Sequence, residues 1–333
     1  MNLGIETWLT RTWLTRGGCS TALIPVAWIY AAMVQCRKIL YQTGLFKSDS
    51  VHATVIVVGN IVAGGGGKTP LTMAIVEHLQ AAGYSVGIVS RGFGRRSADV
   101  QEVERNSVPQ DVGDEPLMMK RRCHVPVFVA GRRADAAQAL LAAYPATQII
   151  VCDDGLQHPA LARDIEICAM DARGIGNGRM LPAGPLREPW PRAVDLLIHT
   201  GQRALPEGFS GKRFLADSAV DASGQRTLLR DLHAQKVNAV AAIAQPQAFF
   251  DMLLAQGLSL GETFALQDHA LFDNWSAPAG DTPLLCTEKD AVKLWGRYPN
   301  ALAVPLTFQP EPAFLAALDA QLRQHRQHHS PTR

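Results

Sequence analysis

The chain has 333 residues, of which 47% are hydrophobic and 19% charged. This composition can fill a sizeable core and excludes a mainly disordered protein. With 32 Lys and Arg against 30 Asp and Glu, the formal net charge is +2, so bulk charge does not favour nucleic-acid binding. The six cysteines form no Cys-x-x-Cys pair, which argues against a zinc ribbon or disulfide scaffold and fits a reducing compartment.

Residues 1–50 contain an apolar stretch with no charge between Arg16 and Arg37. Its continuous apolar part, residues 21–34, is shorter than the roughly 20 residues of a membrane span, and Pro25 is expected to interrupt it. Aromatic residues of the type that favours a bilayer interface accompany it, namely Trp8, Trp13, Trp28 and Tyr30. We expect a helix lying in the membrane interface. A buried helix of a soluble fold, a cleaved signal peptide or a full span are the alternatives.

Residues 51–215 alternate between strand and helix patterns. The β-branched run at 52–59 predicts a buried parallel strand, and the spacing over 70–82 predicts a helix that stops at Gly83. Further strands are predicted at 85–90, 125–130, 148–152, 164–170 and 194–199, and helices at 115–122 and 132–143. This alternation predicts an α/β fold with a mostly parallel sheet covered by helices.

Residues 216–325 repeat the alternation on a smaller scale. Strands are expected at 237–243 and 283–286, with helices at 246–256, from Glu288, and at 311–325. We therefore expect a smaller C-terminal α/β part that completes the active site. The polar residues 326–333 are expected to form a frayed tail.

The strongest local motif is a glycine-rich loop between the first strand and the first helix. Glycines let a backbone wrap around phosphates, and the following helix directs its free N–H groups at the anion. Lys68 would reach the β- and γ-phosphates and the Thr69 hydroxyl would hold Mg²⁺. Val62 stands where the strict phosphate-loop pattern has a glycine, so the motif is a variant. The predicted ATP-binding residues are Gly64, Gly65, Gly66, Gly67, Lys68 and Thr69.

Two acidic motifs follow predicted elements. Asp153 and Asp154 end a strand, which suits carboxylates that orient Mg²⁺ directly or through water; an Asx turn is the alternative. Which of the two lies nearer the metal stays open. Asp114, in Gly-Asp-Glu-Pro, is either a helix N-cap or a catalytic base.

The remaining polar motifs are less specific. The loop over 171–189, rich in glycine, proline and arginine, is suited to a phosphate or charged substrate, or is a surface loop. A lone histidine such as His269 is more often structural than catalytic. Thr287 either faces the nucleotide cleft or caps a helix.

Taken in order, six motifs resemble the tetraacyldisaccharide 4′-kinase family. They are Gly-Gly-Gly-Gly-Lys-Thr-Pro-Leu71, Ser90-Arg-Gly-Phe-Gly94, Val112-Gly-Asp-Glu-Pro116, Asp153-Asp-Gly-Leu-Gln-His158, the run from Asp171 to Pro189, and Thr287 to Lys293. The resemblance implies a phosphate-loop NTPase-like fold. It also implies transfer of the γ-phosphate of ATP to the 4′-hydroxyl of tetraacyldisaccharide 1-phosphate, giving lipid IV-A. The implied location is the cytoplasmic face of the inner membrane, peripheral or monotopic, with ATP and Mg²⁺ as cofactors.

The same resemblance assigns residues. Asp114 and His269 match a catalytic pair, Asp153 and Asp154 match metal-associated aspartates, and Lys68 matches the phosphate-loop lysine. Contacts to substrate or phosphate are expected from Asn60, Arg91, Gln157, His158, Arg187 and Glu188. The lipid disaccharide is the expected partner, with no nucleic acid and no obligate protein partner.

This chemistry is consistent with the residues themselves. Phosphoryl transfer needs charge neutralisation and alignment, and Asp114 hydrogen-bonded to His269 could take the proton of the sugar hydroxyl. We also expect the two halves to move so that His269 reaches Asp114. Two other functions stay open: a phosphate-loop ligase acting through an acyl-phosphate, and a membrane-attached nucleotide switch. Acyl-chain preference, oligomeric state and the depth of helix insertion are not predicted.

Overall fold

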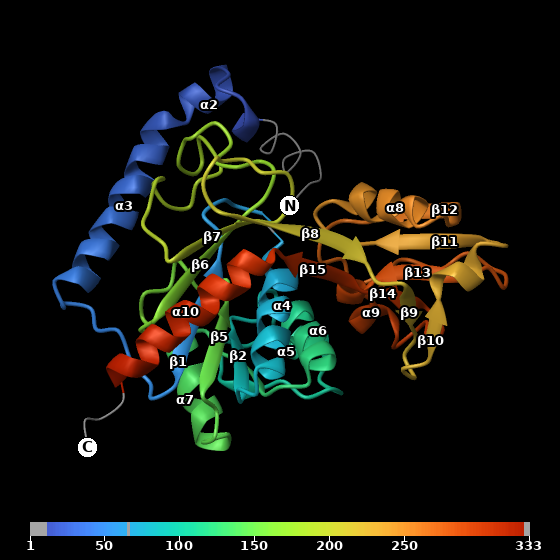
Figure 1. The fold of residues 1–333 in the computed structure, drawn as a ribbon. Helices are drawn as coiled ribbons and strands as arrows, with labels where there is room; N and C mark the ends of the chain where they lie inside the picture. Colours follow the sequence, from blue (N-terminus) through green and yellow to red (C-terminus); the bar gives the residue numbers. More distant parts are fainter. Residues whose placement is uncertain (1–11, 65–66, 330–333) are drawn as a thin grey trace.

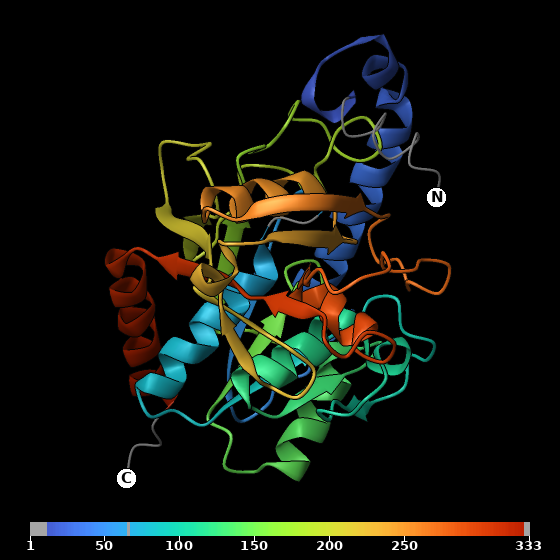
Figure 2. The ribbon, with the colours of Figure 1, turned by 90° about the vertical axis from the view of Figure 1, so that its right-hand side faces the viewer.

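The computed structural model describes residues 12–64 and 67–329, and for 326–329 the backbone alone. The predictions made for Trp8, Gly65, Gly66 and residues 330–333 lie outside the described residues. Two sheets lie beside each other, and helices pack on both (Figures 1 and 2). The expected α/β fold with a large, mostly parallel sheet is confirmed, and the smaller sheet is mixed.

The larger sheet has nine strands. In spatial order they are β15 (Leu306–Pro310), β8 (Phe209–Leu215), β7 (Leu196–His199), β6 (Ile165–Met170), β1 (Thr54–Gly59), β5 (Ile149–Asp153), β2 (Val86–Ser90), β4 (Val127–Val129) and β3 (Gln101–Glu102). All neighbours pair parallel except β15 with β8 and β3 with β4, which pair antiparallel at the two edges. The register pairs Val58 of β1 with Asp153 of β5, so the glycine-rich turn and the aspartates leave the sheet at the same edge.

Helices cover both faces of this sheet. On one face α4 (Lys68–Ala81), α6 (Asp114–Cys123) and α10 (Pro312–His329) bury their apolar side chains against it. On the other, α7 (Arg133–Ala143) and the loop over 171–189 do the same. The short helix α5 (Pro109–Val112) precedes α6 directly. The central strands are buried on both sides, which explains their continuous apolar runs.

The smaller sheet has six strands. Their order is β10 (Arg226–Leu228), β9 (Ser218–Val220), β14 (Leu302–Val304), β13 (Leu284–Thr287), β11 (Lys236–Ala241) and β12 (Ser259–Ala265). Helices α8 (Pro246–Ala255) and α9 (Glu288–Leu294) and the 3₁₀ turn η1 (Leu229–Leu232) accompany it. Within the stretch 216–325, β15 and most of α10 return to the larger sheet. Helix α10 also continues through residues 326–329, part of the expected tail.

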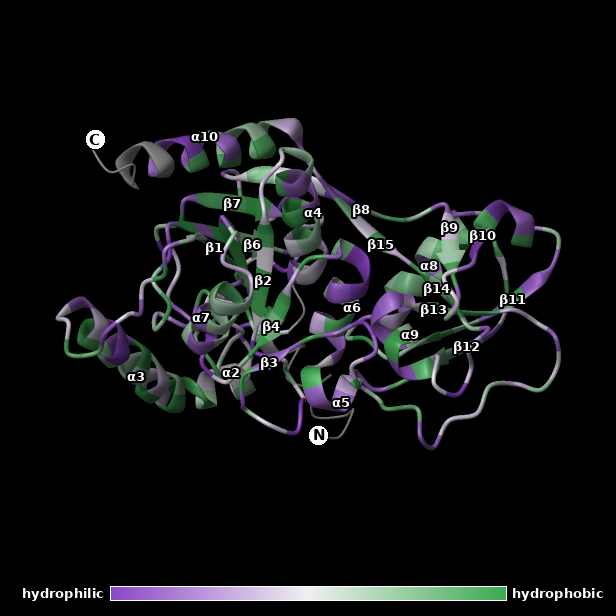
Figure 3. Ribbon diagram, turned by 90° about the horizontal axis from the view of Figure 1, so that it is seen from below, coloured by the Kyte–Doolittle hydropathy of each residue, from purple (hydrophilic) through white to green (hydrophobic). Residues whose placement is uncertain are grey.

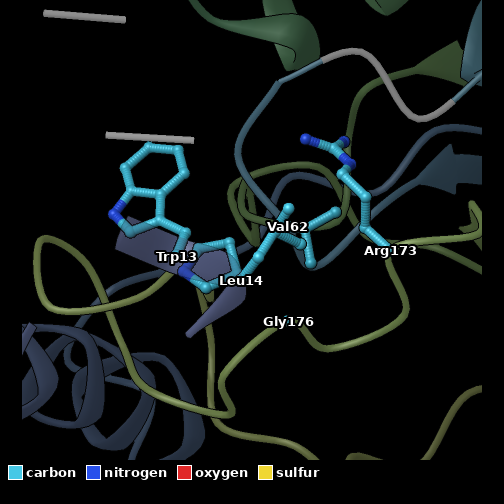
Figure 4. Close-up of a pocket in the computed structure, with 6 residues that line it drawn as sticks. Trp13, Leu14, Val62, Arg173 and Gly176 are labelled. Atoms are coloured by element: carbon cyan, nitrogen blue, oxygen red, sulfur yellow. The ribbon is translucent and has the colours of Figure 1, made fainter. Parts of the chain in front are cut away.

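The N-terminal part consists of α2 (Gly18–Ala22) and α3 (Ile24–Gln42), which run along one side of the larger sheet (Figure 1). The expected interruption is confirmed: α2 ends at Ala22 and α3 begins at Ile24, so the helix breaks at Leu23, two residues before Pro25. Pro25 lies in the first turn of α3, where its missing N–H costs no helical hydrogen bond. The segment is fixed to the loop over 171–189: Trp13 Nε1 donates to Pro182 O at 3.0 Å, and Ser20 Oγ donates to Ala183 O at 2.6 Å. Where the two segments meet, a small pocket is lined by Trp13, Leu14, Val62, Arg173, Gly176 and Pro185 (Figure 4).

Helix α3 contains many apolar residues (Figure 3), and several of their side chains are exposed to solvent. Four side chains, called here the apolar face of α3, are at least half exposed: Val26 50%, Trp28 71%, Ile29 64% and Met33 67%. By contrast, Ala27 is buried. Among the described residues, no helix combines the length and apolar character needed to cross a bilayer.

Candidate active site

The glycine-rich loop lies between β1 and α4. Gly67 precedes α4 with a left-handed φ of 71°, and no side chain of the described residues caps the helix, so its first N–H groups are available to an anion. A side chain at Gly67 would have its Cβ 3.1 Å from Thr200 Oγ1, so a larger residue would also be crowded here. Gly64 has a φ of 89°. The described part of the loop therefore has the geometry expected of a phosphate cradle.

Lys68 begins α4 and lies beside the aspartates. Its Nζ is 3.2 Å from Asn60 Oδ1 and 3.5 Å from Asp154 Oδ1, and only 11% of its side chain is exposed. The Asn60 amide also donates to Gly64 O at 3.3 Å. Asn60, predicted to contact substrate or phosphate, thus holds both the lysine and the loop in place.

The two adjacent aspartates have opposite environments. Asp153 is buried and accepts a hydrogen bond from Thr72 Oγ1 at 2.8 Å. Burial, together with the nearby Glu115 and Asp154, raises its pKa to about 7. Asp154 has a left-handed φ of 50°, and its Oδ1 lies 2.9 Å from Arg187 Nη1. Burial would raise the pKa of Asp154, but Lys68 and Arg187 outweigh it and lower the pKa.

These opposite shifts predict opposite effects on stability in metal-free protein. The pKa of Asp153 is higher in the folded protein than in the unfolded chain. Its carboxyl therefore destabilises the fold increasingly as the pH rises from the pKa of the unfolded chain to the folded-state pKa of about 7. The pKa of Asp154 is lower in the folded protein than in the unfolded chain. Its carboxylate therefore stabilises the fold at pH values above the pKa of the unfolded chain, and this stability is lost as the pH falls through the folded-state pKa. At pH 8 in EDTA we expect Asp153→Asn to raise the Tm by a few degrees and Asp154→Asn to lower it. At pH 5 the gain from Asp153→Asn should shrink. Thermal unfolding at both pH values measures this, and a lower Tm for Asp153→Asn at pH 8 would contradict it.

A hydrogen-bond network joins the loop over 171–189 to the aspartates. Arg187 Nη1 donates to Asp154 Oδ1 at 2.9 Å and to Gln157 Oε1 at 3.0 Å. Gln157 Nε2 donates to Glu188 Oε1 at 2.7 Å and to Asn60 O at 2.9 Å. The structure therefore brings Asn60, Gln157, Arg187 and Glu188 together around Asp154, as a site at this sheet edge requires.

His158 and Arg91 lie on the side toward α3. His158 is half-buried, and burial together with Arg133, Arg37 and Arg91 lowers its pKa to about 3, so it is neutral at physiological pH. Arg91 follows β2 and is exposed. Arg133 is almost fully buried and donates to Asp154 O at 2.7 Å. This side of the site carries positive charge that suits an anionic group.

Asp114 and His269 meet where the two sheets adjoin. Asp114 is the first residue of α6, and His269 follows β12 with a left-handed φ of 63°. His269 Nδ1 lies 3.1 Å from Asp114 Oδ2, and Lys293 Nζ lies 3.2 Å from the same oxygen. Burial would raise the pKa of Asp114, but the hydrogen bond of His269 and the charge of Lys293 outweigh it and lower the pKa. The pair is formed in this structure without further movement.

Three further charged residues of the site, Glu115, Lys289 and Lys293, lie within the motifs quoted from the sequence but were assigned no role there. Glu115 Oε2 accepts a hydrogen bond from Thr69 Oγ1 at 3.3 Å, which connects the loop to α6. Lys289 Nζ lies 3.6 Å from Glu115 Oε1 and 3.2 Å from His269 Nε2. Lys289 and Lys293 are four residues apart on a predicted helix and therefore lie on one face of it. This spacing could have indicated from the sequence that the two lysines act at one site.

Together, the mostly parallel sheet, the glycine-rich loop with Lys68 and Thr69, and the acidic residues beside it have the arrangement expected of a kinase. The sequence pattern of the family described as tetraacyldisaccharide-1-P 4′-kinase matches residues 19–323. The chain belongs to this family and is a tetraacyldisaccharide 4′-kinase of lipid A biosynthesis.

Individual relatives agree with this assignment. The tetraacyldisaccharide 4′-kinase of Acidovorax sp. (strain JS42) is 52% identical over 320 residues, covering 94% of each chain. That of Polaromonas sp. (strain JS666 / ATCC BAA-500) is 53% identical over 322 residues, covering 94% of this chain and 95% of its own. The crystal structure of LpxK from Aquifex aeolicus in complex with ATP matches with a TM-score of 0.80 at 28% identity, covering 92% of this chain and 99% of that one.

Proposed function

We propose that the chain binds the triphosphate of ATP on the loop up to Thr69 and transfers the γ-phosphate to the 4′-hydroxyl of tetraacyldisaccharide 1-phosphate, giving lipid IV-A. One observation carries this proposal: the Asp114–His269 pair, at 3.1 Å, lies next to the loop through Glu115, which Thr69 contacts at 3.3 Å. A base and a phosphate cradle thus adjoin, which is the arrangement that phosphate transfer to a hydroxyl needs. The phosphate-loop NTPase-like reading of the fold is part of this proposal.

Each charged group has a role in this reaction. Lys68 would neutralise charge on the β- and γ-phosphates, and Arg187, which contacts the same oxygen of Asp154 as Lys68, would add a second positive charge. Asp114 would accept the proton of the sugar hydroxyl while His269 holds the carboxylate in place. Gln157 and Glu188 would fix Arg187, while Arg91 and the neutral His158, with Arg37 of α3 nearby, would face the anionic 1-phosphate of the acceptor.

The residues present also suit Mg²⁺. Among the described residues, no group of three or more His, Cys, Asp or Glu side chains could hold a metal ion by itself. Mg²⁺ in kinases is held by one or two carboxylates together with phosphates and water, so a small protein contribution suffices. The raised pKa of Asp153 reflects first its burial and then the negative charges of Glu115 and Asp154, and a bound cation would offset these effects. We infer that Thr69 and Asp153, with Asp154 beside them, would hold Mg²⁺, which supplies charge neutralisation for the transferred phosphoryl group.

The test is phosphate transfer from radiolabelled γ-ATP to tetraacyldisaccharide 1-phosphate in mixed micelles, with and without Mg²⁺. A labelled lipid product whose formation requires Mg²⁺ supports the proposal. ATP hydrolysis without labelled lipid would instead favour a nucleotide switch, and ATP-dependent coupling of a soluble carboxylate would favour a ligase. The absence of labelled lipid from well-folded protein would overturn the proposal.

We further infer that the apolar face of α3 lies in the interface of the cytoplasmic leaflet of the inner membrane. An acceptor with four acyl chains stays in the bilayer, so the enzyme must reach it there. The exposed Trp28, Ile29 and Met33 supply apolar area for this contact, and Trp28 is of a type enriched at bilayer interfaces. Tyr30 OH donates to Arg187 O at 3.1 Å, so α3 is directly connected to the active site.

Replacing Trp28 and Met33 by Glu in one protein is expected to weaken binding to anionic phospholipid vesicles by about tenfold or more, because two apolar side chains lose their burial. Sedimentation with vesicles measures the binding. The control carries the same charge change at exposed polar positions of α3, Gln35→Glu with Gln42→Glu. Equal vesicle binding by both double variants would contradict the assignment of this face.

A further inference from the structure

Two lysines of α9 contact two adjacent carboxylates of α6. Lys293 Nζ lies 3.2 Å from Asp114 Oδ2, and Lys289 Nζ lies 3.6 Å from Glu115 Oε1. The lysines are four residues apart on α9 and therefore share one helix face. Because α6 packs on the larger sheet and α9 follows β13 of the smaller one, both ion pairs cross between the two sheets.

Lys293 is held in place by its surroundings. Only 1% of its side chain is exposed, and a buried ammonium group needs its counter-charges close by. The second of these is Asp290, at 3.3 Å, and the ammonium also lies over the Phe272 ring at 5.5 Å. Asp290 is itself fixed, since it accepts hydrogen bonds from Thr287 Oγ1 at 2.7 Å and from Ala242 N at 2.9 Å.

The partners of Asp114 leave one carboxylate oxygen for another molecule. His269 Nδ1 and Lys293 Nζ both approach Oδ2. Within residues 12–64 and 67–329, no hydrogen bond or ion pair is formed with Oδ1. The hydrogen bond with His269 and the charge of Lys293 therefore both hold Oδ2, and Oδ1 stays available.

Lys289 determines the proton position on His269. Its Nζ lies 3.2 Å from His269 Nε2 and 3.0 Å from Asp268 Oδ1. An ammonium group can only donate, so Nε2 must accept and carries no proton. The ring proton of the neutral histidine is then on Nδ1, which donates it to Asp114. The ring also packs at a tilted angle against Phe93, with centroids 5.3 Å apart, which restrains its rotation.

We propose that Lys289 and Lys293 are positioning residues for the catalytic pair: Lys293 presents Asp114 Oδ1 to the acceptor hydroxyl, and Lys289 holds His269 as the Nδ1–H tautomer. This inference rests on the proposed catalytic role of Asp114. Neither lysine touches the reacting atoms. They act through Asp114 and His269. Because both lysines belong to α9, the position of the catalytic pair depends on how the two sheets dock.

The first test is ¹⁵N NMR of protein labelled at histidine, at a pH where His269 is neutral, with the resonances assigned by their loss in His269→Gln. We expect a protonated Nδ1 and an unprotonated Nε2 in the parent. Lys289→Met should move the Nε2 resonance because its ammonium donor is gone, and Lys289→Arg should restore much of the parental position. An Nε2–H tautomer in the parent would overturn the role of Lys289.

The second test is kinetic. Lys293→Met is expected to lower kcat by about 10²-fold with the KM for ATP within twofold, because misplacement of a catalytic group affects the chemical step. The control is Lys120→Met on α6, a lysine that pairs with Glu102 at 3.9 Å and is away from the catalytic pair. If Lys293→Met does not fold, the kcat values of Lys289→Met and Lys289→Arg are compared with that of Lys120→Met instead.

The outcomes separate two ideas. If both lysine-to-methionine variants match Lys120→Met in kcat while Asp114→Asn is inactive, the positioning role is overturned. If Asp114→Asn itself keeps full activity, the catalytic role of Asp114 fails instead. The NMR measurement still decides the tautomer in that case, because it does not depend on turnover.

Discussion

Replacing Lys68 by Met is expected to lower kcat for lipid phosphorylation by about 10³-fold or more. The ammonium group lies at the N-terminal end of α4, beside Asn60 at 3.2 Å, and only 11% of the side chain is exposed. A fixed cation in such a sheltered site stabilises developing phosphoryl charge more than a solvated one does. Methionine keeps the apolar body of the side chain and removes the charge.

A second effect adds to the first. Lys68 lies 3.5 Å from Asp154 and helps to lower the pKa of that carboxyl. Without Lys68, Arg187 alone neutralises the charge of Asp154, and we expect it to neutralise less of the charge on the phosphates. The initial rate of labelled lipid formation measures the loss, with Lys236→Met, an exposed lysine at the start of β11, as the control. A Lys68→Met variant that keeps more than a tenth of the parental kcat would contradict the assignment.

Much of the site's location could be predicted because its signals are local. The glycine-rich loop follows one buried, β-branched strand, and Asp153 is the last residue of another. Since parallel strands end at the same edge of a sheet, residues after β1 and β5 must come close once those strands pair, as Val58 and Asp153 do. The length of each apolar run and the glycines that follow it were sufficient to predict these two strands.

Other parts of the fold gave weaker signals. Strand β12 is largely exposed, so its residues lack the apolar alternation that marks a half-buried strand. Strand β15 pairs with β8, which lies far earlier in the chain, and nothing local specifies that partner. Pairing between distant strands depends on which strand edges remain unpaired after the core forms. No short segment of the sequence contains this information.

The catalytic pair shows the same limit. Asp114 and His269 are 155 residues apart, and neither has a local signal stronger than an N-cap or a lone histidine. The family resemblance placed them together, and the geometry explains how: α6 and α9 dock through charged side chains, and Asp114 is buried beside Lys293 as a result. Pairing buried charges in this way is costly unless every partner is present, which makes the α6–α9 contact specific.

Replacing Asp114 by Asn is expected to lower kcat by about 10²- to 10⁴-fold, the usual contribution of a general base. Asparagine keeps the shape of the side chain and can still accept a hydrogen bond, but it cannot take the proton of the sugar hydroxyl. ATP binding should change little, because Asp114 contacts His269 and Lys293, and no contact with the described residues of the loop is formed. The control is Asp111→Asn on α5, whose exposed carboxylate pairs with Arg96 at 3.6 Å. Parental kcat in Asp114→Asn would exclude a role as base.

The pH dependence gives an independent check on the same residue. A base with a lowered pKa stays ionised at mildly acidic pH, and its activity is lost only as pH falls through the lowered value. His269 contributes to that lowering through its hydrogen bond, so His269→Gln should move the acid limb of kcat/KM to higher pH. Asp111→Asn should leave the limb where it is. An acid limb that His269→Gln does not move would mean that the titrating group is not Asp114, even if Asp114→Asn is inactive.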